Sequence, residues 1–269
     1  MGRTTRLRGN SPLFAARMGW DNLASVNVCS LADAVRRMVP RAFVFPVPAA
    51  LNDESAAALP NPGMSAWLSL TYRAKLMSGE SVLILGATGV TGRLAVRLAK
   101  LLGAGRVVGA GRNPEGLRSL LQLGADATIR LDTPDNELRE SFLREAGASV
   151  FQVVIDYLWG HPTEVFLSAI TSRTFAAIGT ETRLVQVGET AGPNIAFPAA
   201  VLRSTALTVL GTTGIPSLDI LNAAFRKVMN YAAAGDLQVA TTSIPLAEIA
   251  SAWDQKESGR RVVIIPGLL

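Results

Sequence analysis

Ser81-Val-Leu-Ile-Leu-Gly-Ala-Thr-Gly-Val-Thr-Gly92 is the stretch around which the rest of the chain is organised. The apolar run at 82–85 is too short for a helix and is typical of a parallel strand covered on both faces. Three glycines then mark a turn, and leucines at helical spacing over 93–102 predict a helix after it. A strand that turns on glycines into a helix points free backbone N–H groups at the turn. Together with the positive end of the helix dipole, these groups suit the loop to a phosphate.

The residues after the next predicted strand, at 106–110, indicate which dinucleotide such a loop would take. Dinucleotide-binding folds place the residue that reads the ribose about this far along the chain from the glycine loop. An acid there binds the ribose 2′-hydroxyl, whereas a cation favours a 2′-phosphate. Arg112 and Asn113 stand here with no acid before Glu115, so we predict NADPH in preference to NADH. On the alternative interpretation, Arg112 is a solvated loop residue and Asn113 caps the helix that begins at Pro114. Both interpretations can hold together.

Beyond the loop, predicted strands alternate with predicted helices, which is the pattern of an α/β protein with a doubly wound parallel sheet. Ligands of such sheets bind beyond the carboxyl ends of the strands. Residues at those ends are therefore candidates for a binding rim: Thr88, Gly89, Val90, Thr91, Arg112, Tyr157, Leu158, Gly188 and Thr212.

The segments on either side of this alternation predict further elements. Pro46 and Pro48 cannot donate to a central ladder, so the apolar run at 42–48 predicts an edge strand. Asn52 is suited to capping a helix over 52–59, which the proline- and glycine-containing stretch 60–63 would end. More helices are predicted at 64–76, 215–234 and 245–253, and a last strand at 260–265.

Composition restricts the class of protein. The chain has 269 residues, 49% of them hydrophobic, and no apolar run approaches the roughly 18 residues that span a bilayer. One cysteine, Cys29, excludes an internal disulfide, and one histidine, His161, leaves too few ligands for a typical zinc site. We therefore predict no metal, no membrane association and a cytoplasmic location.

The net charge of +5 resides in the N-terminal segment, since residues 1–41 hold seven arginines and two aspartates. The remainder is neutral, which argues against a nucleic-acid surface there. Residues 1–40 are expected to form an irregular basic segment. A transit peptide, a basic arm that touches nucleic acid or membrane, and an unstructured or non-native leader are the alternatives, and we favour the leader.

Four motifs occur together in this chain: Asn61-Pro-Gly-Met-Ser-Ala-Trp67, the stretch 79–92, Leu123-Gly-Ala-Asp126 and Gly259-Arg-Arg-Val-Val-Ile-Ile-Pro266. As a set they are similar to the medium-chain dehydrogenase/reductases, and within them to the zinc-free quinone oxidoreductase branch. The resemblance runs from about Arg41 to the end. It implies a Rossmann domain over 77–234 and remnants of a GroES-like β-barrel domain over 41–76 and 235–269. It also implies NADPH-dependent hydride transfer to a quinone, enone or related carbonyl compound.

The resemblance also implies roles for individual residues. Thr88, Gly89, Val90 and Thr91 would contact the pyrophosphate through backbone N–H groups, and Arg112 and Asn113 would meet the 2′-phosphate. The nicotinamide would be lined by Tyr157, Leu158, Gly188 and Thr212, with Asn61 and Ser65 near its end at the domain junction. Packing on the next helix is an equal alternative for Tyr157 and Leu158, and a tight turn is the alternative for Gly188. No catalytic residue is identified.

Members of the resembled family begin with a complete β-barrel catalytic domain, and residues 1–40 do not resemble it. Two functions therefore stay open: an NADPH-dependent reductase of a small carbonyl or quinone substrate, and a catalytically weak NADP-binding module whose cleft is incomplete. Strand edges that the barrel normally pairs would be exposed, which predicts an association hazard or a homodimer surface. Nucleic-acid binding through the basic arm is the weakest hypothesis.

Overall fold

The computed structural model describes residues 45–147, 150–171, 181–212, 217–252 and 259–265, and every structural statement below concerns these residues. The first part of the predicted edge strand at 42–48 lies outside them. Residues 45–48 are not a strand, so that prediction is wrong for them. The Phe45 ring instead stacks on Phe225, with the ring centroids 4.5 Å apart.

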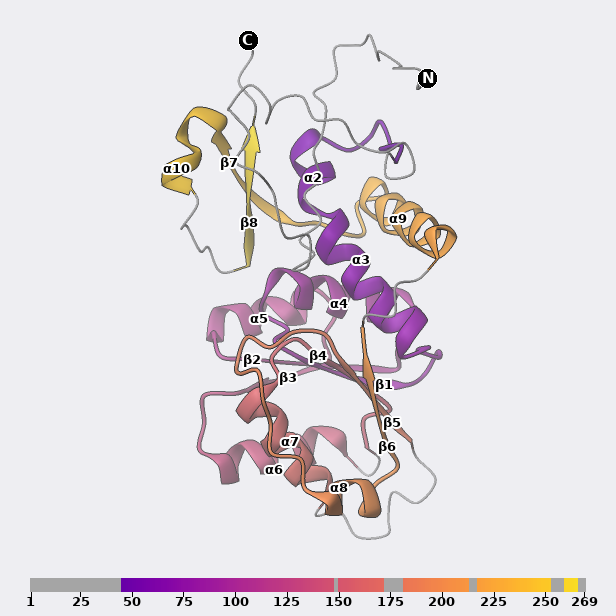
Figure 1. Cartoon of the computed structure of the whole chain (residues 1–269), viewed down its shortest axis with the longest axis vertical. Coiled ribbons are helices and arrows are strands. Elements are labelled where there is room, and N and C mark those ends of the chain that lie inside the picture. The colour runs from indigo at the N-terminus through magenta and orange to yellow at the C-terminus, as the bar shows by residue number, and fades with distance from the viewer. Residues whose placement is uncertain (1–44, 148–149, 172–180, 213–216, 253–258, 266–269) are drawn as a thin grey trace, which may run out of the picture.

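A six-stranded parallel sheet forms the centre of the molecule, in the order β3-β2-β1-β4-β5-β6 (Figure 1). The strand order reverses between β1 and β4, and ligands of doubly wound sheets bind at such a switch point. Residues 82–85 of β1 are fully buried, as the apolar run predicts. The strands are β1 Ser81–Leu85, β2 Arg106–Gly111, β3 Ala127–Arg130, β4 Val153–Asp156, β5 Thr182–Gln186 and β6 Leu207–Gly211.

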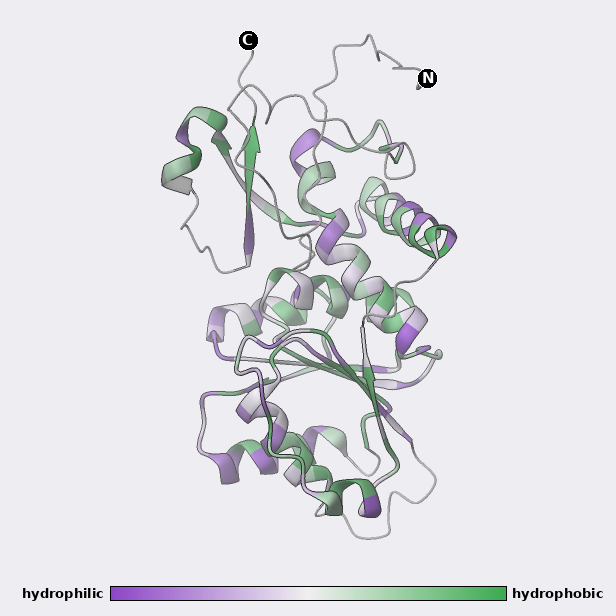
Figure 2. Ribbon diagram, viewed as in Figure 1, coloured by the Kyte–Doolittle hydropathy of each residue, from purple (hydrophilic) through white to green (hydrophobic). Residues whose placement is uncertain are grey.

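Helices cover both faces of this sheet (Figure 1). One face packs against α3 Pro60–Leu68, α4 Val90–Leu101, α5 Pro114–Gln122 and α9 Leu218–Ala233, and the other against α6 Asp135–Ala146, α7 Gly160–Thr171 and α8 Ala199–Ser204. Within β1, Val82 and Ile84 join the first core and Leu83 and Leu85 the second, because successive side chains of a strand alternate between faces. Figure 2 shows the central strands as strongly hydrophobic. The predicted doubly wound α/β fold is confirmed.

A smaller parallel sheet consists of β7 Ala240–Pro245 and β8 Arg260–Ile265, with α2 Asp53–Ala58 and α10 Ile249–Ala252 nearby (Figure 1). The bounds of β8 agree with the prediction, whereas β7 and α8 are elements that the sequence did not predict. The assignment of 41–76 and 235–269 to a remnant of a β-barrel domain stays a prediction. None of the described helices combines the length and apolar character that crossing a bilayer requires.

The helix prediction near residue 60 is wrong in one respect. Residues 60–63 do not end a helix but begin α3, because proline is tolerated in the first turn of a helix, where its missing N–H would be unpaired anyway. Gly63 allows close approach to α9, since a Cβ there would lie 2.6 Å from Val228 Cγ1. A π-helical segment, Ser69–Arg73, follows in place of a helix to residue 76. Asn52 caps α2 as predicted, accepting from the Ser55 N–H at 2.9 Å.

Candidate functional site

The loop between β1 and α4 carries backbone N–H groups that lack acceptors. Gly89 is the N-cap of α4 and offers no side-chain oxygen to the first turn. No acceptor in the described part of the chain is hydrogen-bonded to the N–H groups of Thr88, Val90 or Thr91, whereas the Arg93 N–H donates to the Gly89 carbonyl at 2.9 Å. These free donors lie at the positive end of the α4 dipole, where an anion is stabilised.

The space beside this loop is open. A Cβ added at Gly89 would meet only the Gly86 carbonyl oxygen, at 3.5 Å. Gly92 differs, since a Cβ there would lie 2.3 Å from the same oxygen, so Gly92 is required for the packing of α4 against the turn. Free donors beside an unfilled surface fit a phosphate group, and hence the diphosphate of a dinucleotide. The structure brings together the loop residues that the sequence singled out.

The Thr88 side chain connects this loop to the end of β2. It fills the space that two glycines leave, since a Cβ at Gly111 or Gly116 would lie 2.5 Å or 2.9 Å from Thr88 Cγ2. Arg112 follows Gly111 directly, is exposed, and makes no hydrogen bond within the described chain. The loop and the predicted reader of the 2′-phosphate therefore lie at the same edge of the sheet.

The acid near Arg112 is already paired. Arg130 donates two hydrogen bonds of 2.7 Å to the Asp132 carboxylate. These bonds hold the pKa of the Asp132 carboxyl below its ordinary value, and the charge of Arg112 adds a smaller effect. Because Arg130 balances Asp132, the Arg112 guanidinium stays available to an anion.

Asn113 caps α5 through its side-chain oxygen. Its Oδ1 accepts from the N–H groups of Glu115, at 2.9 Å, and Gly116, at 3.0 Å. The capping interpretation of Asn113 is confirmed. A contact between Asn113 and a 2′-phosphate stays a prediction.

The residues after β4 and β5 lie beside the glycine turn. The Tyr157 N–H donates to the Leu85 carbonyl at 3.1 Å, and a Cβ at Gly86 would lie 3.0 Å from Leu158 Cδ2. A Cβ at Gly188 would lie 2.7 Å from the Tyr157 carbonyl oxygen, so glycine is needed there for a close approach of two backbones. Tyr157, Leu158 and Gly188 thus form one group at the switch point, as the strand order predicts.

Asp156, the last residue of β4, fixes the turn that carries this group. Its carboxylate is fully buried. Oδ1 accepts from the N–H groups of Leu158, at 2.8 Å, and Trp159, at 2.9 Å, and Oδ2 accepts from the Thr163 hydroxyl at 2.6 Å. Burial raises the pKa of the Asp156 carboxyl above its ordinary value. The sequence analysis missed this residue, although an acid directly after the apolar strand was a usable signal.

Asp156→Ala is expected to lower the free energy of unfolding by about 3 kcal/mol, because the buried Thr163 hydroxyl and two partly buried N–H groups lose their acceptor. Asp156→Asn keeps an acceptor oxygen and removes a buried charge, so we expect a loss of about 1 kcal/mol or less. Urea denaturation at pH 7 measures both. Equal losses would contradict the acceptor role.

The raised pKa of Asp156 also predicts a pH dependence. A carboxyl whose folded-state pKa is raised contributes stability below its unfolded pKa and loses it as the pH rises through the folded pKa. Wild type should therefore gain stability relative to Asp156→Asn as the pH falls from neutrality. If the difference in unfolding free energy between wild type and Asp156→Asn stays constant with pH, the raised pKa of Asp156 is contradicted.

The remaining predicted residues are less closely tied to the loop. Thr212 directly follows β6, whose Gly211 is opposite Gln186 of β5, so it lies in the row of strand ends. Asn61 and Ser65 are half-buried and one turn apart on α3. No described hydrogen bond joins either residue to the glycine loop, and their place at the nicotinamide end stays a prediction.

Two further polar side chains bear on the chemistry. The Tyr157 hydroxyl is buried and has no hydrogen-bond partner in the described chain, and burial raises the pKa of the phenol, so it stays protonated. His161 is the second residue of α7, a polar residue at a helix start as predicted, and its Nε2 lies 2.8 Å from Asp135 Oδ1. Among the described residues, no group of three or more His, Cys, Asp or Glu is arranged to hold a metal ion. Cys29 lies outside them.

Comparison with known families gives this site a context. The family model described as zinc-binding dehydrogenase matches residues 90–233, which is more than half of the chain. The chain belongs to this family. It is a quinone-oxidoreductase-like member of the medium-chain dehydrogenase/reductases, as the sequence motifs predict.

Individual relatives agree with this assignment. The chain is 31% identical over 227 residues to a probable NADPH-dependent quinone reductase of Emericella nidulans, a match that covers 80% of this chain and 62% of that protein. It is 28% identical to quinone oxidoreductase-like protein 2 of Bos taurus, over 62% of this chain and 45% of the relative. A solved quinone oxidoreductase of Pseudomonas syringae pv. Tomato shares the fold, with a TM-score of 0.68 and 23% identity over 85% of this chain and 69% of that chain. The chain thus spans less than two thirds of the length of these two curated relatives.

Proposed function

We propose that this protein binds NADPH at the glycine loop and reduces a small quinone, enone or related carbonyl compound without zinc. The observation that carries the proposal is the set of free N–H groups on Thr88, Val90 and Thr91, beside the open space at Gly89. The available guanidinium of Arg112 at the same sheet edge supports NADPH rather than NADH. The name of the Emericella nidulans relative, an NADPH-dependent quinone reductase, supports it as well.

In this proposal the protein binds and orients the cofactor. When bound, the reduced nicotinamide supplies the hydride that the substrate accepts. The loop N–H groups hold the diphosphate, Arg112 holds the 2′-phosphate, and the group formed by Tyr157, Leu158 and Gly188 lines the nicotinamide side together with Thr212. Asn61 and Ser65 lie near the nicotinamide end of the cofactor. No side chain is assigned as the acid, and solvent supplies the proton.

A second candidate function is a catalytically weak NADP-binding module. The small extent of the second sheet favours it, because β7 and β8 are its two described strands and give little cover to a substrate. Hydride transfer needs an acceptor held close to the nicotinamide with water excluded. In this case the cofactor binds without turnover, unless a partner completes the cleft.

Oxidation of NADPH in the presence of a panel of quinones and enones, followed by its near-ultraviolet absorbance, distinguishes the two functions. Turnover that is lost in Gly89→Val supports the reductase. Cofactor binding without turnover supports the second candidate, a catalytically weak NADP-binding module. A protein that binds neither NADPH nor NADH contradicts both candidates.

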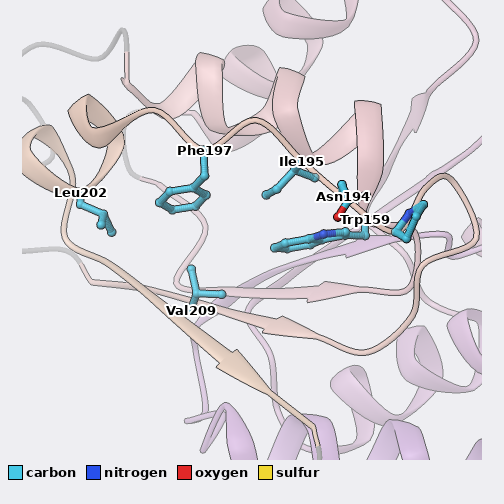
Figure 3. A pocket seen from close by; sticks show the side chains of 7 residues that line it. Trp159, Asn194, Ile195, Phe197, Leu202 and Val209 are labelled. Atoms are coloured by element: carbon cyan, nitrogen blue, oxygen red, sulfur yellow. The ribbon is translucent and has the colours of Figure 1, made fainter.

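We also propose that two copies associate through β6. It is the edge strand of the sheet, and no described strand pairs with its outer side. Beside it lies a groove of about 630 Å³, lined in part by Trp159, Phe197, Leu202 and Val209 (Figure 3). The Leu202 and Val209 side chains are 57% and 41% exposed. Antiparallel pairing of β6 with its copy about a two-fold axis would continue the sheet and cover this apolar surface.

Val209→Asp is expected to convert the dimer to a monomer, since a charge at an edge strand opposes pairing and desolvation. The fold should be retained because the side chain is exposed. Sedimentation velocity measures the mass, and Leu121→Asp, at an exposed apolar position on α5, is the control. A wild-type protein that is monomeric at micromolar concentration would contradict this proposal.

A further inference from the structure

Glu189 is an exposed acid that follows Gly188 at the carboxyl end of β5. Within the described part of the chain, its carboxylate takes part in no hydrogen bond or ion pair. The residues that the proposed function places along the nicotinamide carry no charge: Tyr157, Leu158, Gly188 and Thr212. Glu189 therefore gives this end of the candidate site its negative charge.

The backbone before Glu189 is fixed to the turn after β4. The N–H groups of Val187 and Gly188 both donate to the Asp156 carbonyl, at 2.8 Å and 3.1 Å. A Cβ at Gly188 would lie 2.7 Å from the Tyr157 carbonyl oxygen, so the two backbones touch at this point. Glu189 thus begins from a defined position beside the residues proposed to line the nicotinamide.

The backbone after Glu189 is fixed to the same turn. The Thr190 hydroxyl donates to the Tyr157 carbonyl at 2.8 Å, and the Ala191 N–H donates to the Leu158 carbonyl at 2.8 Å. Since the residues on both sides of Glu189 face the turn, its own side chain lies on the other side, toward solvent, in agreement with its exposure. The carboxylate is therefore held at the rim of the site and is not consumed by a structural contact.

We propose that Glu189 selects the substrate by its charge, and that the site takes neutral or positively charged quinones and enones in preference to anionic ones. This inference rests on the proposed reductase function and names the substrate class. A carboxylate at the rim attracts a cation and repels an anion as either approaches the nicotinamide. Because the carboxylate is exposed, the effect of each charge is modest and is screened by salt.

Steady-state oxidation of NADPH tests the proposal with three benzoquinones, of which one bears a sulfonate, one a quaternary ammonium group and one no charge. The quantity compared is the kcat/KM of the cationic quinone divided by that of the anionic quinone. Differences in intrinsic reactivity between the quinones cancel when this ratio is compared between protein variants.

Glu189→Gln should lower the ratio about fivefold at low ionic strength, and Glu189→Lys about 25-fold, because the first substitution removes one negative charge and the second reverses it. At about 0.5 M salt both changes should shrink to less than about twofold. Glu140→Lys is the matched control. Glu140 is an exposed acid of α6, which follows β3 at the edge of the sheet opposite β6, so its reversal should leave the ratio nearly unchanged.

The outcomes separate this inference from the proposed function. A wild type that reduces the quinones, with a ratio that does not change in Glu189→Lys, overturns the inference and leaves the reductase standing. An equal change for all three quinones also overturns it, because the charge would then act on the cofactor or the fold. Wild type that oxidises NADPH with none of the three contradicts the reductase and this inference together.

Discussion

Gly89→Val is expected to raise the dissociation constants of NADPH and NADH at least about 100-fold while leaving the protein folded. A Cβ at this position meets only the Gly86 carbonyl oxygen, at 3.5 Å, so the free protein has room for the side chain. The backbone φ of −73° also suits valine. The loss of a good N-cap residue should cost about 1 kcal/mol of stability. In the complex, however, the valine would occupy the space through which a phosphate approaches the loop N–H groups.

Fluorescence titration with each cofactor measures the binding, and circular dichroism melting checks the fold. Gly89→Ala is the graded control and should give an intermediate loss, because a single methyl group blocks less of the approach. A folded Gly89→Val protein with wild-type affinity for NADPH would refute the phosphate-binding interpretation of the loop.

Arg112→Asp is expected to weaken NADPH binding about 100-fold and to leave NADH binding nearly unchanged. The substitution replaces an attraction to the doubly charged 2′-phosphate by a repulsion, and NADH has no such group. Arg112 is exposed and makes no described hydrogen bond, so its replacement should not disturb the fold.

Arg118→Asp provides a matched control for this charge reversal. Arg118 is an arginine of α5 whose side chain is 71% exposed, and its Nη2 lies 4.0 Å from Glu115 Oε1. Its reversal should change the binding of both cofactors only slightly, through long-range electrostatics. Equal loss for NADPH and NADH in Arg112→Asp would exclude Arg112 as the reader of the 2′-phosphate.

The parts of the fold that could be predicted are those with a local cause. The apolar run at 82–85, the glycines after it and the leucines of α4 specify strand, turn and helix within about twenty residues. β7 shows the limit, since its sequence Ala-Thr-Thr-Ser-Ile-Pro has little apolar alternation of its own and becomes a strand by pairing with β8. The proline at the start of α3 was misjudged for a related reason, because its effect depends on which turn of the helix it occupies.

The candidate site likewise has parts that the sequence predicts and parts that it does not. Residues at the ends of strands, such as Arg112 and Gly188, could be named because parallel topology brings strand ends to one edge. The packing of Thr88 against Gly111 depends on a contact between separate elements, so the sequence does not reveal it. The hydrogen bonds of Asp156 join it to residues only two, three and seven positions further on, and the acid at the end of the strand was an overlooked signal for them.

Amide hydrogen exchange across residues 86–93, with and without saturating NADPH, tests the central claim most directly. We predict slower exchange of the N–H groups of Thr88, Val90 and Thr91 in the complex, because each gains a phosphate acceptor that the free protein lacks. Unchanged exchange in this segment while NADPH binds would contradict the claim that the glycine loop holds the cofactor.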